Sequence, residues 1–103
     1  MSYNVGGDGY IVLKEESNIG YINDYFLEAF IHYEEKGCGV LTVNVGYNEY
    51  DEIKVLNCLD RIIPYISDGN IVFYDEDGDV WKFVYNKEEE NWIDIDIKIM
   101  PLE

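Results

Sequence analysis

Apolar residues recur at three- and four-residue steps in two segments of the chain, and this is the spacing of one helix face. The first segment spans residues 17–36, and its apolar positions are Ile19, Ile22, Phe26, Ala29, Phe30 and Tyr33. Lys36 lies in its last turn and Gly37 closes it, which is typical of a helix C-terminus. We therefore predict a helix here, although residues 29–33 also fit an extended strand. His32 is predicted to lie on the exposed side of this helix.

The second helix is predicted over residues 49–63. Asn48 can cap its N-terminus, and the acidic residues of its first turn suit the positive end of the helix dipole. The predicted buried stripe consists of Ile53, Leu56, Leu59 and Ile63. Pro64 should end the helix, because a proline disfavours the helical conformation in the residue before it.

Strands are predicted from runs of β-branched and aromatic residues. They cover residues 10–15, 39–45, 71–76, 79–86 and 91–100. The glycine-rich lead at 6–9 is expected to be a flexible turn, and residues 68–70 are expected to be a second turn. Asp77-Gly78 separates two of the strands and predicts a type I′ hairpin.

The last predicted strand alternates cleanly, so its two faces should differ. One face carries Ile93, Ile95, Ile97 and Ile99. The other face carries Trp92, Asp94, Asp96, Lys98 and Met100. We expect the isoleucine face to be dry and the aspartate face to be wet.

These elements predict one α+β domain over residues 1–103, in the order β-α-β-α-β-β-β with a C-terminal meander. Two helices would pack on one side of a mainly antiparallel sheet. The hydrophobic content of 48% is sufficient for a core.

Charge is the outlying property of the composition. The chain carries 22 acidic and 7 basic residues, a net charge of −15, whereas a magnitude of about 2 to 8 is enough to keep a small domain soluble. Both parts of the chain contribute, with 11 acids and 4 bases in residues 1–66 and 11 acids and 3 bases in residues 67–103. Binding to phosphates requires Lys and Arg, so direct binding to nucleic acid or to an anionic membrane is not expected. The chain shows neither a signal-peptide pattern nor an apolar run of about 20 residues, so we expect a cytoplasmic protein.

Patterns for catalysis or cofactors are weak. An EF-hand loop starting at Asp75 would need Gly at its sixth position and Glu at its twelfth, but Val80 and Asn86 stand there. His32 has no motif partners for a catalytic triad. Cys38 and Cys58 are expected to be reduced, partly buried thiols. We therefore expect no catalytic residue, no metal and no cofactor, with a small enzyme or metal-binding domain as the remaining alternative.

The acidic clusters near the C-terminus are better candidates for contact with a partner. They form the tip of the predicted hairpin, the following loop and the wet face of the last strand: Asp75, Glu76, Asp77, Asp79, Glu88, Glu89, Glu90, Asp94 and Asp96. The two loops would lie at opposite ends of the strand between them, and the sheet edge would resemble a phosphate backbone in charge density. Trp92 shares the wet face and is the predicted aromatic anchor, whereas Trp81 is predicted to pack inward. The alternative is a solvated face that prevents edge-to-edge aggregation.

The stretch at 75–85, DEDGDVWKFVY, resembles a hairpin that recurs in small uncharacterised proteins of low-GC bacteria and their phages. In size, charge and aromatic content the chain also resembles anti-CRISPR and anti-restriction proteins of phages and toxin immunity proteins. This resemblance implies a non-enzymatic inhibitor that binds a basic, nucleic-acid-binding surface of a CRISPR effector or other nuclease. The alternative is an immunity protein that neutralises a toxin, and the oligomeric state is left open.

Overall fold

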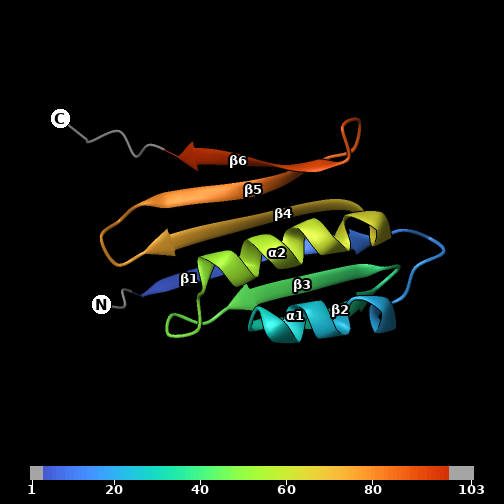
Figure 1. Cartoon of the computed structure of the whole chain (residues 1–103), viewed down its shortest axis with the longest axis horizontal. Coiled ribbons are helices and arrows are strands. Elements are labelled where there is room, and N and C mark those ends of the chain that lie inside the picture. The colour runs from blue at the N-terminus through green and yellow to red at the C-terminus, as the bar shows by residue number, and fades with distance from the viewer. Residues whose placement is uncertain (1–3, 98–103) are drawn as a thin grey trace.

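Six strands form one antiparallel sheet in the computed structural model, which describes residues 4–97 (Figure 1). The strands are β1 (Val5–Leu13), β2 (Ile31–Gly37), β3 (Val40–Val45), β4 (Ile66–Asp75), β5 (Val80–Asn86) and β6 (Asn91–Ile97). Their order across the sheet is β2-β3-β1-β4-β5-β6, so β2 and β6 form the two edges. The helices are α1 (Asn23–Glu28) and α2 (Glu52–Ile62), together with the 3-10 turns η1 (Ile19–Tyr21) and η2 (Ile63–Tyr65). The predicted α+β class and the C-terminal meander are confirmed.

Both helices lie on the same face of the sheet. Figure 1 shows α2 in front of β1, next to β4, and α1 in front of β2. β5 and β6 extend beyond α2 and have no helix in front of them. The largest fully buried side chains lie between the helices and the sheet: Phe26, Phe73, Ile11, Ile22, Leu41, Leu59, Ile62, Ile66 and Ile71. Within residues 4–97, no helix is both long enough and apolar enough to cross a lipid bilayer.

The glycine-rich lead belongs to the first strand, so its prediction as a flexible turn was wrong. β1 begins at Val5 and pairs with β3 on one side and β4 on the other. A Cβ atom on Gly7 would lie 2.6 Å from the Phe73 ring, and one on Gly9 would lie 2.1 Å from the carbonyl oxygen of Asn70. The glycines therefore allow β4 and the core ring to approach β1 closely.

The first predicted helix is correct only in its first half. α1 ends at Glu28, the chain reverses at Phe30, which has a positive φ of 57°, and Ile31 then begins β2. The predicted helix over residues 17–36 is wrong beyond this point because β2 pairs along β3. His32 is exposed as predicted, but it lies on an edge strand.

The second helix is rotated relative to its prediction. Its buried residues are Val55, Cys58, Leu59 and Ile62, whereas Ile53 and Leu56 are 73% and 41% exposed. The N-cap is Asp51, whose side chain accepts a hydrogen bond from the Lys54 amide at 3.1 Å. The predicted cap at Asn48 is therefore wrong.

The turns also differ from their predictions. Residues 68–70 lie inside β4 and are not a turn. In the β4–β5 hairpin the Gly78 amide donates to the Asp75 carbonyl at 3.2 Å, and Gly78 has a φ of 92°. A type I′ turn needs positive φ at both central positions. The central positions here are Glu76 and Asp77, and neither has a positive φ, so the type I′ prediction is wrong. Positive φ at both loop positions occurs instead at Cys38 and Gly39, between β2 and β3.

The prediction for β6 is correct for the exposure of Asp94 and Asp96 and wrong for the dry isoleucine face, and the face toward the helices is the opposite one to that expected. Trp92 pairs with Tyr85, and Asp94 pairs with Phe83, so the aspartates share the face that packs toward α2. The isoleucines lie on the opposite face, and Ile93, Ile95 and Ile97 are 38%, 39% and 37% exposed. Because β6 is an edge strand beyond the helices, neither of its faces is dry. Lys98, Ile99 and Met100 lie outside the described residues.

Candidate partner-binding surface

Most carboxylates of the described chain are exposed to solvent. No charged or polar residue among residues 4–97 is buried. In this range Lys36 forms an ion pair with Glu34 at 2.8 Å, and Nε2 of His32 lies at hydrogen-bond distance, 2.9 Å, from a carboxylate oxygen of Glu49. Lys36 holds the pKa of Glu34 below its ordinary value through its hydrogen bond and its charge. Most carboxylates are therefore available to an external cation.

The first acidic loop is organised by Asp75. Its Oδ1 accepts hydrogen bonds from the amides of Asp77 at 2.9 Å and Asp79 at 3.0 Å. The side chains of Glu76, Asp77 and Asp79 are exposed around this bonded core. Asp75 thus maintains the turn, and its three neighbours present the charge.

The second acidic loop uses an asparagine for the same purpose. Oδ1 of Asn86 accepts from the amides of Glu88 at 2.9 Å and Glu89 at 3.1 Å. Glu90 has a positive φ of 53° and returns the chain to β6. The two loops lie at opposite ends of β5, as predicted (Figure 1), and β5 has seven residues, so they are about 20 Å apart.

The Trp92 side chain packs against α2 and β5 of its own chain. Its indole N–H donates to the carbonyl oxygen of Leu59 in α2 at 2.8 Å, and its ring meets Tyr85 at a centroid distance of 5.6 Å. The ring also covers Gly69, where an added Cβ would lie 2.4 Å away. The predicted placement of Trp92 on a wet face was wrong, because the ring is half-buried and joins β6 to α2. Its role as an aromatic anchor stays a prediction. Trp81 packs inward as predicted, stacked 6.0 Å from Phe73.

Beyond Trp92, two adjoining hollows of about 220 and 250 Å³ lie between α2 and the strands β5 and β6. We call them together the α2–β6 groove. The first is lined by Leu56, Leu59, Asp60, Ile63, Phe83, Asn91 and Trp92. The second is lined by Tyr50, Glu52, Leu56, Trp81, Phe83, Asp94 and Asp96. The groove therefore combines an aromatic floor with a rim of carboxylates.

The structure brings only part of the predicted set together. Asp94, Asp96 and Trp92 line the α2–β6 groove, whereas the two acidic loops stand apart from it and from each other. Sequence reasoning missed Glu52, Leu56 and Asp60 on α2. The signal for Leu56 was present, because α2 has more apolar positions than one buried stripe requires.

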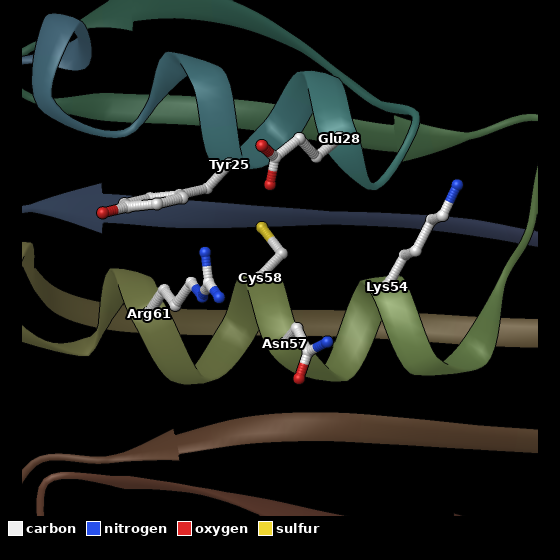
Figure 2. Close-up of a pocket in the computed structure, with 6 residues that line it drawn as sticks. All are labelled: Tyr25, Glu28, Lys54, Asn57, Cys58 and Arg61. Atoms are coloured by element: carbon white, nitrogen blue, oxygen red, sulfur yellow. The ribbon is translucent and has the colours of Figure 1, made fainter.

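A separate small cleft of about 70 Å³ lies between α1 and α2. Figure 2 shows the Cys58 thiol pointing from α2 toward α1, with Lys54 and Arg61 on either side of it along the helix. Arg61 lies 5.9 Å from the centre of the Tyr25 ring. Burial, together with the charge of Glu28, raises the pKa of Cys58 to about 12. The thiol is therefore protonated at neutral pH and is a poor nucleophile.

The described side chains do not form an evident metal site. Among residues 4–97, no group of three or more His, Cys, Asp or Glu side chains is placed to hold a metal ion.

A scan against protein-family models, a search of curated proteins and a search of solved structures each found no match to this chain.

Proposed function

We propose that this protein is a non-enzymatic inhibitor that binds a basic, nucleic-acid-binding surface of a CRISPR effector or another nuclease in the bacterial cytoplasm. The observation that carries the proposal is the net charge of −15 on a fold whose described carboxylates are mostly exposed and mostly unpaired. Bound in this way, the inhibitor occupies the site that DNA or RNA needs.

Exposed and unpaired carboxylates suit this role for a physical reason. A carboxylate already paired with a Lys or Arg of its own chain must break that pair before it can attract a partner. Free carboxylates instead sum to a long-range negative potential, which raises the association rate with a cationic surface. An immunity protein against a nuclease toxin would use the same contact, and the identity of the captured protein distinguishes the two.

Capture from a lysate of phage-infected or CRISPR-bearing bacteria tests the proposal. We expect the immobilised protein to retain a basic nuclease, which is released by added duplex DNA and by increasing salt. The purified nuclease should then lose DNA cleavage when the protein is added in excess.

Charge-reversed variants provide the comparison. Glu76→Lys/Asp77→Lys, Glu88→Lys/Glu89→Lys and Asp94→Lys/Asp96→Lys should each weaken capture. Glu15→Lys/Glu16→Lys is the matched control, because it makes the same charge change at exposed residues after β1. Asp75 is left intact because it maintains its turn. Capture that resists salt and DNA, or a nuclease that cleaves normally when bound, would refute the proposal.

A further inference from the structure

A strip of the sheet lies uncovered beside α2. The helix-facing side of β5 and β6 extends past α2 in Figure 1, and its residues form the floor of the α2–β6 groove. Neighbouring strands are about 4.8 Å apart, so two strands give a floor about 10 Å wide. This is the diameter of one helix, and α2 provides one wall. Trp92 bridges the strip at one end through its hydrogen bond to Leu59 in α2. Past Trp92, over Trp81 and Phe83, the strip has the width for one more helix in the same layer.

The groove is apolar where such a helix would rest. Trp81 and Phe83 form its floor, and Leu56 faces both hollows from α2. Leu56 is 41% exposed, and Ile53, one turn earlier, is 73% exposed. Leu56 therefore leaves apolar surface in solvent directly beside an aromatic floor, and Ile53 extends the exposed apolar surface of α2 beyond the groove lining.

The rim of the groove is acidic. Asp94 and Asp96 border it on β6, and Glu52 and Asp60 border it on α2, with no Lys or Arg among the described lining residues. Asp94 and Asp96 are two residues apart on a strand, so about 6.8 Å separates them. Basic residues at positions i and i+4 of a helix are about 6 Å apart along its axis. A basic helix parallel to β6 can therefore meet both aspartates.

We propose that the α2–β6 groove binds an amphipathic helix of the protein partner. The apolar stripe of that helix rests on Leu56 and Trp81, and its Lys or Arg residues at i and i+4 pair with Asp94 and Asp96. A second copy of this chain is a poor occupant, because its own exposed stripe on α2 is flanked by Glu52 and Asp60 and would bring acid against acid. The proposal rests on the proposed function and specifies the contact that the partner makes.

Binding of a synthetic peptide tests the groove directly. The probe is a peptide of about 18 residues, long enough to form a helix, with leucines at i, i+3, i+4 and i+7 and arginines flanking them. A scrambled peptide of the same composition spreads the leucines around the helix. We expect the amphipathic peptide to bind at least about tenfold more tightly by calorimetry, and to shift the indole N–H resonances of Trp81 and Trp92.

Matched variants separate the groove from general attraction between charges. Asp94→Asn/Asp96→Asn should weaken the amphipathic peptide about tenfold, whereas Glu88→Gln/Glu89→Gln removes the same charge outside the groove and should have a smaller effect. Leu56→Gln should weaken binding without changing net charge, and Leu56 is exposed enough to be replaced without loss of folding. Equal binding of both peptides, or equal loss in both charge-neutralised variants, would overturn the proposal.

Other occupants give different results in the same experiment. An extended peptide alternating arginine and valine that binds more tightly than the helical peptide would indicate pairing at the free edge of β6, and would overturn the helix proposal. If the protein forms a dimer and Leu56→Gln disrupts that dimer, a second copy occupies the groove, and the helix proposal is again overturned. The experiments distinguish failure of this proposal from failure of the proposed function. The proposal of helix binding in the groove is supported if the helical peptide binds, even when no nuclease is inhibited. The inhibitor role stands if capture depends on charge but not on Leu56.

Discussion

The two cysteines occupy opposite environments, and their chemistry should differ accordingly. Cys38 is exposed in the turn between β2 and β3, and Cys58 is buried in α2. The expectation that both are partly buried was therefore wrong for Cys38. We predict that, in the folded protein at pH 8, a thiol reagent modifies Cys38 rapidly and leaves Cys58 unmodified until denaturant is added. Mass spectrometry after alkylation checks this, with Cys38→Ser as the control that should show no rapid modification.

Cys58 should also make the protein sensitive to alkali. Its pKa is about 12 in the folded state against an ordinary value of 9.0, so the folded state keeps a proton that the unfolded state releases between these values. The stabilisation is complete below about pH 9 and is lost as pH rises toward 12. Burial raises the pKa of Tyr85, and a hydrogen bond to Asp8 raises the pKa of Tyr74. Both tyrosines therefore also lower the free energy of unfolding as pH rises above about 10.

Urea unfolding at pH 8 and at pH 10.5 measures this effect. The free energy of unfolding should fall with pH in the natural protein, and should fall less in Cys58→Val, which has a similar volume and no proton to lose. We expect the two slopes to differ by about 1 kcal/mol per pH unit over this range. Identical slopes would mean that Cys58 ionises normally in the folded state.

At the scale of elements, α2 shows what its sequence could and could not predict. Its position and approximate length follow from periodicity, but the buried side does not. One apolar stripe contains Val55, Cys58 and Ile62, and another contains Ile53 and Leu56. Which stripe is buried depends on how the helix sits on the sheet, and that is a tertiary choice. The same ambiguity hid the α2–β6 groove, because Leu56 of the stripe left in solvent lines its wall.

The edge strands were mispredicted because their state depends on neighbours. Tyr33 fits the predicted helix stripe, but Ile31 and Tyr33 also alternate as in a strand, and pairing with β3 decides in favour of the strand. In β6 the alternation was recognised correctly, but the direction of each face was not. Register with β5 sets that direction by placing Trp92 beside Tyr85. The exposure of the acidic loops was predictable, since their turn residues and charges are local features.

Trp92 should contribute to stability by joining β6 to α2. Trp92→Phe keeps a ring beside Tyr85 but removes the N–H that donates to Leu59, and it should cost about 1–2 kcal/mol. Trp92→Ala also uncovers Gly69 and should cost about 3–5 kcal/mol. Urea denaturation monitored by circular dichroism gives both values. If Trp92→Phe is as stable as the natural protein, the hydrogen bond to α2 contributes nothing.

At the scale of the whole molecule, the net charge of −15 should oppose folding. The described chain offsets little of it internally, since Lys36 pairs with Glu34 and the remaining contact of this kind joins Glu49 to His32, which the net charge counts as neutral. Salt reduces repulsion between exposed charges beyond a screening length of about 10 Å at 0.1 M. We predict that Tm rises by several degrees between about 0.02 M and 0.5 M NaCl, since about 1 kcal/mol corresponds to roughly 4–8 °C for a domain near this size.

Calcium chloride separates screening from specific binding in the same melting experiment. At matched ionic strength, CaCl₂ and NaCl should raise Tm by similar amounts if the acidic loops are solvated. Glu88→Gln/Glu89→Gln should start from a higher Tm and respond less to salt, because part of the repulsion is already gone. A Tm that falls as NaCl is added would mean that attractive pairs dominate the surface. A rise of several degrees at micromolar Ca²⁺ would mean that the carboxylates form a cation site, and the cationic protein partner would then lose its main physical basis.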